Sequence, residues 1–145
     1  MRIVLCDDEQ DILQSTSRLL QSIFQERCIE LELVCFQDSA SCYAYLLQND
    51  ADIVILDIYL DQQLGINLAM RLREQGKRFK LIFLTTSNEF ASESYEVDAC
   101  YYLHKPFGPD RVQAMLDRLD LAEMERLRTV ILPDGATVAL RSILY

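Results

Sequence analysis

The chain has 145 residues, the size of one ordinary domain with a short appendage. Half of the residues are hydrophobic and 26% are charged, so a sizeable core is expected and a disordered chain is not. The formal net charge of −9 opposes non-specific binding to DNA or to an anionic membrane surface. No apolar run is long enough for a membrane-spanning helix.

Targeting and cysteine signals exclude further classes of protein. The apolar start Met1–Cys6 meets the acids Asp7–Glu9 too soon for a signal peptide. The five cysteines are scattered without a C-x-x-C pair, and His104 is the sole histidine, so neither a disulfide framework nor a zinc site is expected. Reduced thiols in a cytoplasm are the simplest interpretation, and we expect a cytoplasmic protein.

The first part of the chain alternates strand and helix signals. Arg2–Cys6 is predicted to be a strand, and Leu31–Phe36 a second one. Between them a helical stripe carries Ile12, Leu13, Leu19, Leu20, Ile23 and Phe24. Asp38 or Ser39 is expected to cap the next helix. The apolar side of that helix is predicted to hold Tyr43, Leu46 and Leu47.

The alternation continues to about residue 122. Ile53–Leu56 and Leu81–Leu84 are continuous apolar runs, typical of central strands covered on both faces, and Ala99–Leu103 is a less apolar fifth strand. A turn containing Gly65 leads into a third helix, and a mostly polar helix is expected around Glu89–Glu96. The third helix is striped by Leu68, Ala69 and Leu72, and a last helix by Val112, Leu116 and Leu119. The pattern predicts an α/β fold: a doubly wound, five-stranded parallel sheet in three layers.

The pattern changes after residue 122. Leu121–Arg128 is a charged stretch, either helical or a hinge. Thr129–Leu132 and Ala136–Leu140 read as two strands around the tight turn Pro133–Gly135. We therefore divide the chain into a domain over residues 1–122 and an appended segment over residues 123–145.

Chemistry-bearing residues follow the predicted strands. Because parallel strands end at one edge of the sheet, five side chains are expected to meet there. They are Asp7, Asp8, Asp57, Thr85 and Lys105. Three close carboxylates repel one another, and oxygen ligands with retained water suit Mg²⁺. A carboxylate beside Mg²⁺ and an ammonium is also a plausible phosphoryl acceptor.

Each of these residues taken alone has a simpler explanation, such as a helix cap, a solvated loop or a turn. Their coincidence at successive strand ends favours a shared site. The set Asp7–Asp8, Asp57, Thr85 and Lys105–Pro106 resembles the receiver domain of bacterial two-component response regulators, over about residues 1–122. The resemblance implies a flavodoxin-like (CheY-like) fold. It also implies that Asp57 takes a phosphoryl group from a sensor histidine kinase and becomes a 4-aspartylphosphate.

The resemblance also implies roles for the neighbouring residues. Asp8, Asp57 and the backbone carbonyl of Tyr59 would bind Mg²⁺ directly, and Asp7 mainly through a bound water. Lys105 would pair with the phosphoryl group, and its bond to Pro106 would be cis. Thr85 would be the switch hydroxyl and Tyr102 the switch aromatic. The family's signalling face would comprise the polar helix, the strand with Tyr101 and Tyr102 and the last helix, with a phosphorylation-dependent homodimer as one outcome.

The chain departs from the family pattern near the site. Asp61 and Leu64 occupy loop positions where the family commonly has Pro and Asp, although Gly65 is kept. Thr86 replaces a small residue, and Tyr59 is bulky for its place beside the acceptor. His104 stands where an apolar residue is usual, and we expect it to be an exposed or half-buried strand-end residue.

The last residues carry a second resemblance. Val130–Gly135 followed by Ser142–Tyr145 is similar to the opening strands of the LytTR-type DNA-binding domain, which follows receivers in some regulators. On that resemblance the chain is a truncated transcription regulator. DNA would be bound only through the missing C-terminal domain.

Two other functions stay open at this point. A haloacid-dehalogenase-type phosphatase also uses an Asp nucleophile with Mg²⁺, but it needs a second carboxylate two residues later, where this chain has Tyr59. The other alternative is a receiver-like interaction module that no longer accepts phosphate. We interpret the chain as a phosphoryl-accepting switch and not as an enzyme acting on a separate substrate.

Overall fold

A computed structural model describes residues 1–60, 63–86, 99–119, 129–131 and 137–139. Its centre is a five-stranded parallel sheet with the strand order β2-β1-β3-β6-β7. The strands are β1 (Arg2–Cys6), β2 (Glu32–Phe36), β3 (Ile53–Asp57), β6 (Lys80–Thr85) and β7 (Ala99–His104). The five predicted strands and their parallel arrangement are confirmed.

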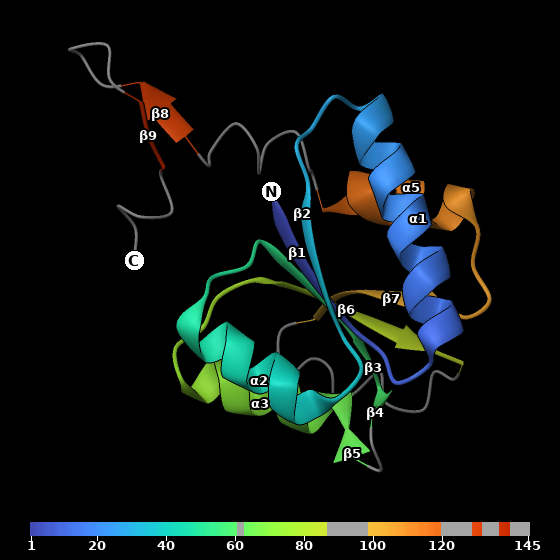
Figure 1. The fold of residues 1–145 in the computed structure, drawn as a ribbon, viewed down its shortest axis with the longest axis vertical. Coiled ribbons are helices and arrows are strands. Elements are labelled where there is room, and N and C mark those ends of the chain that lie inside the picture. Colours follow the sequence, from blue (N-terminus) through green and yellow to red (C-terminus); the bar gives the residue numbers. More distant parts are fainter. Residues whose placement is uncertain (61–62, 87–98, 120–128, 132–136, 140–145) are drawn as a thin grey trace.

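Four described helices cover the sheet. They are α1 (Gln10–Glu26), α2 (Ser39–Gln48), α3 (Gly65–Glu74) and α5 (Pro109–Arg118). Figure 1 shows α1 and α5 on one face of the sheet and α2 and α3 on the other, which gives the predicted three layers. The predicted helix over Glu89–Glu96 and the charged stretch Leu121–Arg128 lie outside the described residues.

The alternation of side chains along the strands builds two cores. In β3, Ile53 and Ile55 face the layer of α1 and α5, whereas Val54 and Leu56 face the layer of α2 and α3. Every residue of β3 is buried, as expected for a central strand of a parallel sheet. This strand therefore delivers its last residue, Asp57, to the sheet edge in a fixed position.

The helices largely follow the sequence pattern. The predicted stripe of α1 faces the core, with Leu13, Leu20, Ile23 and Phe24 buried and Ile12 and Leu19 packed beside them. Asp38 caps α2 by accepting a hydrogen bond from Ser41 N at 2.7 Å. The prediction for Leu47 was wrong: it is exposed, and Cys42 is buried with Leu46 because residues four apart share one helix face.

Two short antiparallel pairs complete the described structure. β4 (Tyr59–Leu60) pairs with β5 (Gln63–Leu64) between β3 and α3. β8 (Thr129–Ile131) pairs with β9 (Thr137–Ala139), in agreement with the two strands predicted for the tail. None of the helices in the described part of the chain is both long enough and apolar enough to cross a bilayer.

Candidate functional site

The candidate residues meet at the carboxyl-terminal edge of the sheet. Asp7 and Asp8 directly follow β1, and Asp57 and Thr85 are the last residues of β3 and β6. Lys105 directly follows β7, and its backbone N–H donates to the carbonyl of Thr85 at 2.8 Å. The neighbouring order β1-β3-β6-β7 thus places these strand ends side by side.

The three acids form one cluster. One carboxylate oxygen from each of Asp7, Asp8 and Asp57 lies within 4.8 Å of the others. Asp7 is completely buried and Asp57 is 5% exposed, whereas Asp8 is exposed. The cluster therefore extends from the protein interior to solvent, so that an ion can reach it from outside.

The ammonium group of Lys105 pairs with both buried acids, Asp7 and Asp57. Lys105 Nζ lies 2.9 Å from Asp7 Oδ2 and 3.3 Å from Asp57 Oδ2. The other oxygens accept backbone N–H groups: Asp7 Oδ1 from Glu9 N at 2.9 Å and Asp57 Oδ1 from Tyr59 N at 3.2 Å. These contacts fix the directions of both carboxylates.

The surplus of negative charge shows in the pKa of Asp57. Burial and, second, the nearby Asp7 carboxylate raise the pKa of Asp57 to about 6, against the opposing effects of Lys105 and of Tyr59 N–H. Burial alone would lower the pKa of Lys105, but the contacts with Asp7 and Asp57 outweigh it and raise that pKa. Lys105 therefore stays positively charged. Among the described residues, its one charge does not balance the charges of the carboxylates around it.

The donor set fits a hard divalent cation. Asp7 Oδ2 is buried and, among the described residues, accepts no hydrogen bond besides its ion pair with Lys105. Carboxylate oxygens with open access for water are the ligands that Mg²⁺ prefers. The cluster of Asp7, Asp8 and Asp57 is thus suited to this ion, as the spacing at strand ends predicted.

The predicted switch residues lie on the neighbouring strands β6 and β7. Thr85 is buried at the end of β6. Tyr102 in β7 is half-buried, and its ring centroid lies 5.9 Å from that of its strand neighbour Phe83. His104 is exposed, as expected, and the Lys105–Pro106 peptide bond is cis, as the resemblance implied.

Two side chains near Asp57 face solvent. Tyr59, two residues after Asp57, is 47% exposed, and Thr86, next to Thr85, is exposed as well. Both positions depart from the family pattern. They lie at the same sheet edge as the acid cluster.

Comparison with known protein families identifies the family of this chain. The family of response regulator receiver domains matches residues 3–117, a range that contains the acid cluster, Thr85 and Lys105. The chain belongs to this family. A receiver domain acts in phosphorylation-dependent signalling, and the receiver domains of response regulators take phosphoryl groups from histidine kinases.

The curated relatives that match this chain include two response regulators. Sensory transduction protein LytT of Bacillus subtilis is 27% identical over 131 residues, which are 87% of this chain and 53% of LytT. Transcriptional regulatory protein YpdB of Escherichia coli is 28% identical over 123 residues, 84% of this chain and 48% of YpdB. The chain spans about half the length of these relatives.

Solved structures confirm the fold. The response regulatory domain of protein mrkE from Klebsiella pneumoniae has a TM-score of 0.74 at 28% identity, covering 87% of this chain and 99% of that one. Chemotaxis protein CheY4 of Vibrio cholerae has a TM-score of 0.67 at 27% identity, covering 81% of this chain and 96% of that one. The predicted CheY-like architecture is therefore correct.

Sequence reasoning missed how closely Gly65 approaches Asp57. A Cβ atom built on Gly65 would lie 2.1 Å from the backbone oxygen of Asp57. The available signal was a glycine, a poor helix former, at the start of an otherwise regular helix pattern.

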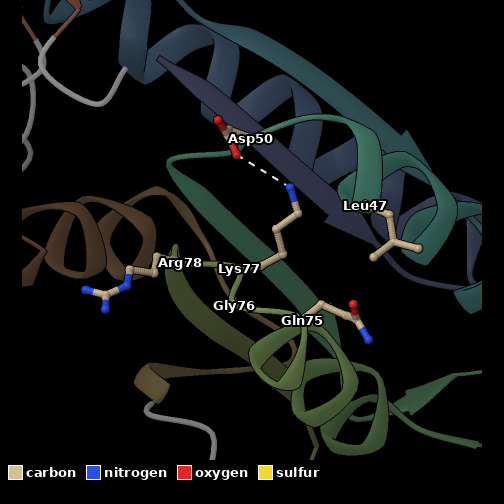
Figure 2. A pocket seen from close by; sticks show the side chains of 6 residues that line it. All are labelled: Leu47, Asp50, Gln75, Gly76, Lys77 and Arg78. Atoms are coloured by element: carbon tan, nitrogen blue, oxygen red, sulfur yellow. Dashed lines mark ion pairs between the residues drawn. The ribbon is translucent and has the colours of Figure 1, made fainter. Parts of the chain in front are cut away.

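A polar pocket lies at the opposite, amino-terminal edge of the sheet. It has a volume of about 390 Å³ and is lined by Leu47, Asp50, Gln75, Gly76, Lys77 and Arg78. Figure 2 shows the ion pair between Lys77 and Asp50, with 3.6 Å between the charged atoms, across this pocket. None of the predicted site residues lines it.

Proposed function

We propose that this receiver domain accepts a phosphoryl group on the side chain of Asp57. The observation that carries the proposal is the place of this carboxylate. It ends the buried central strand, lies within 4.8 Å of Asp7 and Asp8 and stands 3.3 Å from the Lys105 ammonium. Of the three acids, only Asp57 combines the central strand with direct contact to both the lysine and the metal-binding cluster.

The proposed donor is a phosphohistidine of a sensor histidine kinase. In the transfer, the N–P bond of the donor breaks, its electron pair returns to the imidazole, and an O–P bond forms to a carboxylate oxygen of Asp57. Lys105 and the Thr85 hydroxyl are proposed to pair with the phosphoryl oxygens, where negative charge must be stabilised. Asp57 attacks in its ionised form, which a bound cation favours over the protonated form.

The cation that we propose is Mg²⁺. Asp8, Asp57 and the backbone carbonyl of Tyr59 would hold it directly, and Asp7 mainly through water. When bound, it neutralises charge on the transferring phosphoryl group. Support comes from the three clustered carboxylates and from the buried Asp7 Oδ2, whose contact with a donor among the described residues is its ion pair with Lys105.

The proposed switch runs from the phosphoryl group to β7 and α5. Thr85 would move toward the phosphoryl group and Tyr102 would turn inward, changing the surface near Tyr101 and favouring a homodimer. Sedimentation with and without beryllofluoride, a phosphoryl mimic, tests this. Association in its presence is expected, and an unchanged mass at all concentrations would contradict the dimer.

The appended segment fits a second proposal. Residues 1–122 are the receiver, and residues 123–145 are a linker and the first strands of a LytTR-type DNA-binding domain. The antiparallel pair β8–β9 and the half-length match to LytT and YpdB support this division. DNA binding and control of transcription would then belong to that second domain.

The receiver is proposed to hydrolyse its own acyl phosphate without acting on a separate substrate. The phosphatase alternative needs a general acid at the position of Tyr59, and a tyrosine is a poor substitute for a carboxylic acid there. Incubation with p-nitrophenyl phosphate separates the two functions. Many turnovers per protein would favour the phosphatase.

Intact mass after incubation with acetyl phosphate and Mg²⁺ tests the proposed function. The wild-type chain should gain the mass of one phosphoryl group. A receiver-like module that has lost this chemistry would gain none.

A further inference from the structure

The segment that follows Asp57 leads through β4 and β5 and comes back into contact with Asp57 at Gly65. Asp57 ends β3, the pair β4–β5 places Tyr59 opposite Leu64, and Gly65 then begins α3. Figure 1 shows β4 and β5 beside the start of α3. The end of this loop thus lies against the backbone of the residue that we propose to be phosphorylated.

Two backbone hydrogen bonds hold the residue after the acceptor. The N–H of Ile58 donates to the carbonyl of Leu84 in β6 at 3.1 Å, and the carbonyl of Ile58 accepts the N–H of Gly65. Both peptide groups of Ile58 are therefore fixed, one by the sheet and the other by the start of α3. The backbone between Asp57 and Tyr59 has little freedom to move by itself.

The Cα atom of Gly65 also lies close to the backbone of Asp57 and leaves no room for a side chain. A Cβ at this position would lie 2.1 Å from the carbonyl oxygen of Asp57, 3.1 Å from its carbonyl carbon and 3.4 Å from Ile58 Cα. All three atoms belong to the backbone, so no side-chain rotation relieves the clash. The backbone of Gly65 lies outside the left-handed region, so the need for glycine here is steric and not conformational.

We propose that Gly65 is a positioning residue for the phosphoryl-acceptor site. Its lack of a side chain lets α3 begin in contact with Asp57 and so fixes both the acceptor carboxylate and Tyr59. Tyr59 supplies the N–H that orients Asp57 Oδ1 and the carbonyl proposed as a metal ligand. This inference rests on the proposed function, because it concerns the same site.

The expected effect of adding one methyl group follows from its size. In Gly65→Ala the Asp57 backbone has to shift by about 1 Å, and misplacement on this scale costs a factor of ten to about a hundred in rate. Alanine is a better helix former than glycine, so a purely helical role predicts a variant at least as stable as wild type. Loss of site function therefore distinguishes positioning from helix propensity.

The experiment compares Gly65→Ala with Gly108→Ala, because a Cβ on Gly108 meets no atom within 4 Å. Amide NMR titration measures Mg²⁺ affinity, intact mass over time gives the rate of phosphorylation by acetyl phosphate, and circular dichroism confirms folding. Gly65→Ala should bind Mg²⁺ several-fold more weakly and be phosphorylated about tenfold to a hundredfold more slowly at saturating Mg²⁺. Gly108, the N-cap of α5, tests the opposite case: its alanine variant should lose some stability and keep both site properties.

Wild-type Mg²⁺ affinity and wild-type phosphorylation rate in a folded Gly65→Ala protein would overturn the proposal. A Gly65→Ala chain that does not fold in the presence of Mg²⁺ would also overturn it, because the glycine would then serve the whole fold. If the wild-type chain takes no phosphoryl group, the proposed function fails, and the Mg²⁺ affinities of the two variants alone decide the positioning role.

Discussion

The two edges of the parallel sheet both carry charged side chains, but they balance the charges differently. At the amino-terminal edge, acids have their own basic partners: Asp50 faces Lys77 at 3.6 Å, and Glu32 faces Arg2 at 3.1 Å. All four of these side chains remain between 23% and 60% exposed. Exposed pairs of this kind contribute little to stability and are typical of a protein surface.

Among the described residues, the carboxyl-terminal edge has acids in excess of positive charge. Asp7 and Asp57 share the single ammonium of Lys105, and Asp8 adds a third carboxylate within 4.8 Å. Burying charge without full compensation costs folding free energy, so such a cluster is expected where function requires it. The comparison indicates that the distribution of partners, more than the number of charges, distinguishes the site from the rest of the surface.

Removal of the divalent cation should have the largest effect on phosphorylation at the carboxyl-terminal edge. Phosphorylation by acetyl phosphate should slow by about 100-fold or more in EDTA, because the charge of the transferring group then lacks its main counterion. Asp50→Ala, at the other edge, should react at the wild-type rate with Mg²⁺ present. A wild-type rate that is insensitive to chelation would show that the acids do not act through a metal.

The two exposed side chains near the acceptor should lengthen the life of the phosphorylated state. Tyr59 and Thr86 can cover the approach of water in line with the phosphorus, and neither offers a strong base to orient it. Tyr59→Asn should shorten the half-life by about tenfold or more, and Thr86→Ala by less.

The control for this prediction is Leu47→Asn, because Leu47 is a comparably exposed apolar side chain at the amino-terminal edge. Its phosphorylated half-life should equal that of wild type, with Mg²⁺ held constant. If Tyr59→Asn and Thr86→Ala also keep the wild-type half-life, the shielding argument is wrong and other residues set the lifetime.

In the metal-free protein, the pH dependence of the free energy of unfolding should report the raised pKa of Asp57. The pKa of Asp57 is raised from an ordinary value of 3.8 to about 6, so its folded form binds the proton more tightly than the unfolded chain does. The stabilisation from protonated Asp57 is therefore complete below pH 3.8 and is lost as the pH rises through about 6.

Asp57→Asn removes this titration. In EDTA the variant should be more stable than wild type at neutral pH, by about 1–2 kcal/mol, and this advantage should shrink as the pH falls toward 4. Urea denaturation across this range measures it. Asp50→Asn should show no such trend, and a constant difference for Asp57→Asn would mean that Asp57 ionises normally.

The smallest expected effect comes from the exposed member of the cluster. Asp8→Ala should relieve repulsion and stabilise the metal-free protein, by less than about 1 kcal/mol because solvent screens the charge. The rise in melting temperature that Mg²⁺ produces should fall at the same time. A variant that melts lower than wild type without metal, and still responds fully to Mg²⁺, would show that the three acids are not one site.

The fold and the composition of the site were predictable because the relevant signals are local. Continuous apolar runs such as Ile53–Leu56 mark strands buried on both faces, and parallel strands end at one edge. The ends of three of these strands therefore identified Asp57, Thr85 and Lys105 as neighbours although they are far apart in the sequence.

Other features depend on tertiary contacts that no local pattern encodes. Asp7 and Asp8 are identical in type and adjacent, yet Asp7 is buried and Asp8 is exposed. The two-residue strands β4 and β5 are too short for a periodic signal. Likewise, the approach of Gly65 to Asp57 follows from how α3 meets the sheet.

The most direct test of the account is where the phosphoryl group goes. Wild type, Asp57→Ala and Asp50→Ala are each incubated with acetyl phosphate and Mg²⁺, and their intact masses are measured. Wild type and Asp50→Ala should each gain one phosphoryl group, and Asp57→Ala should gain none. A full gain of mass in Asp57→Ala would contradict the assignment of Asp57 as the acceptor.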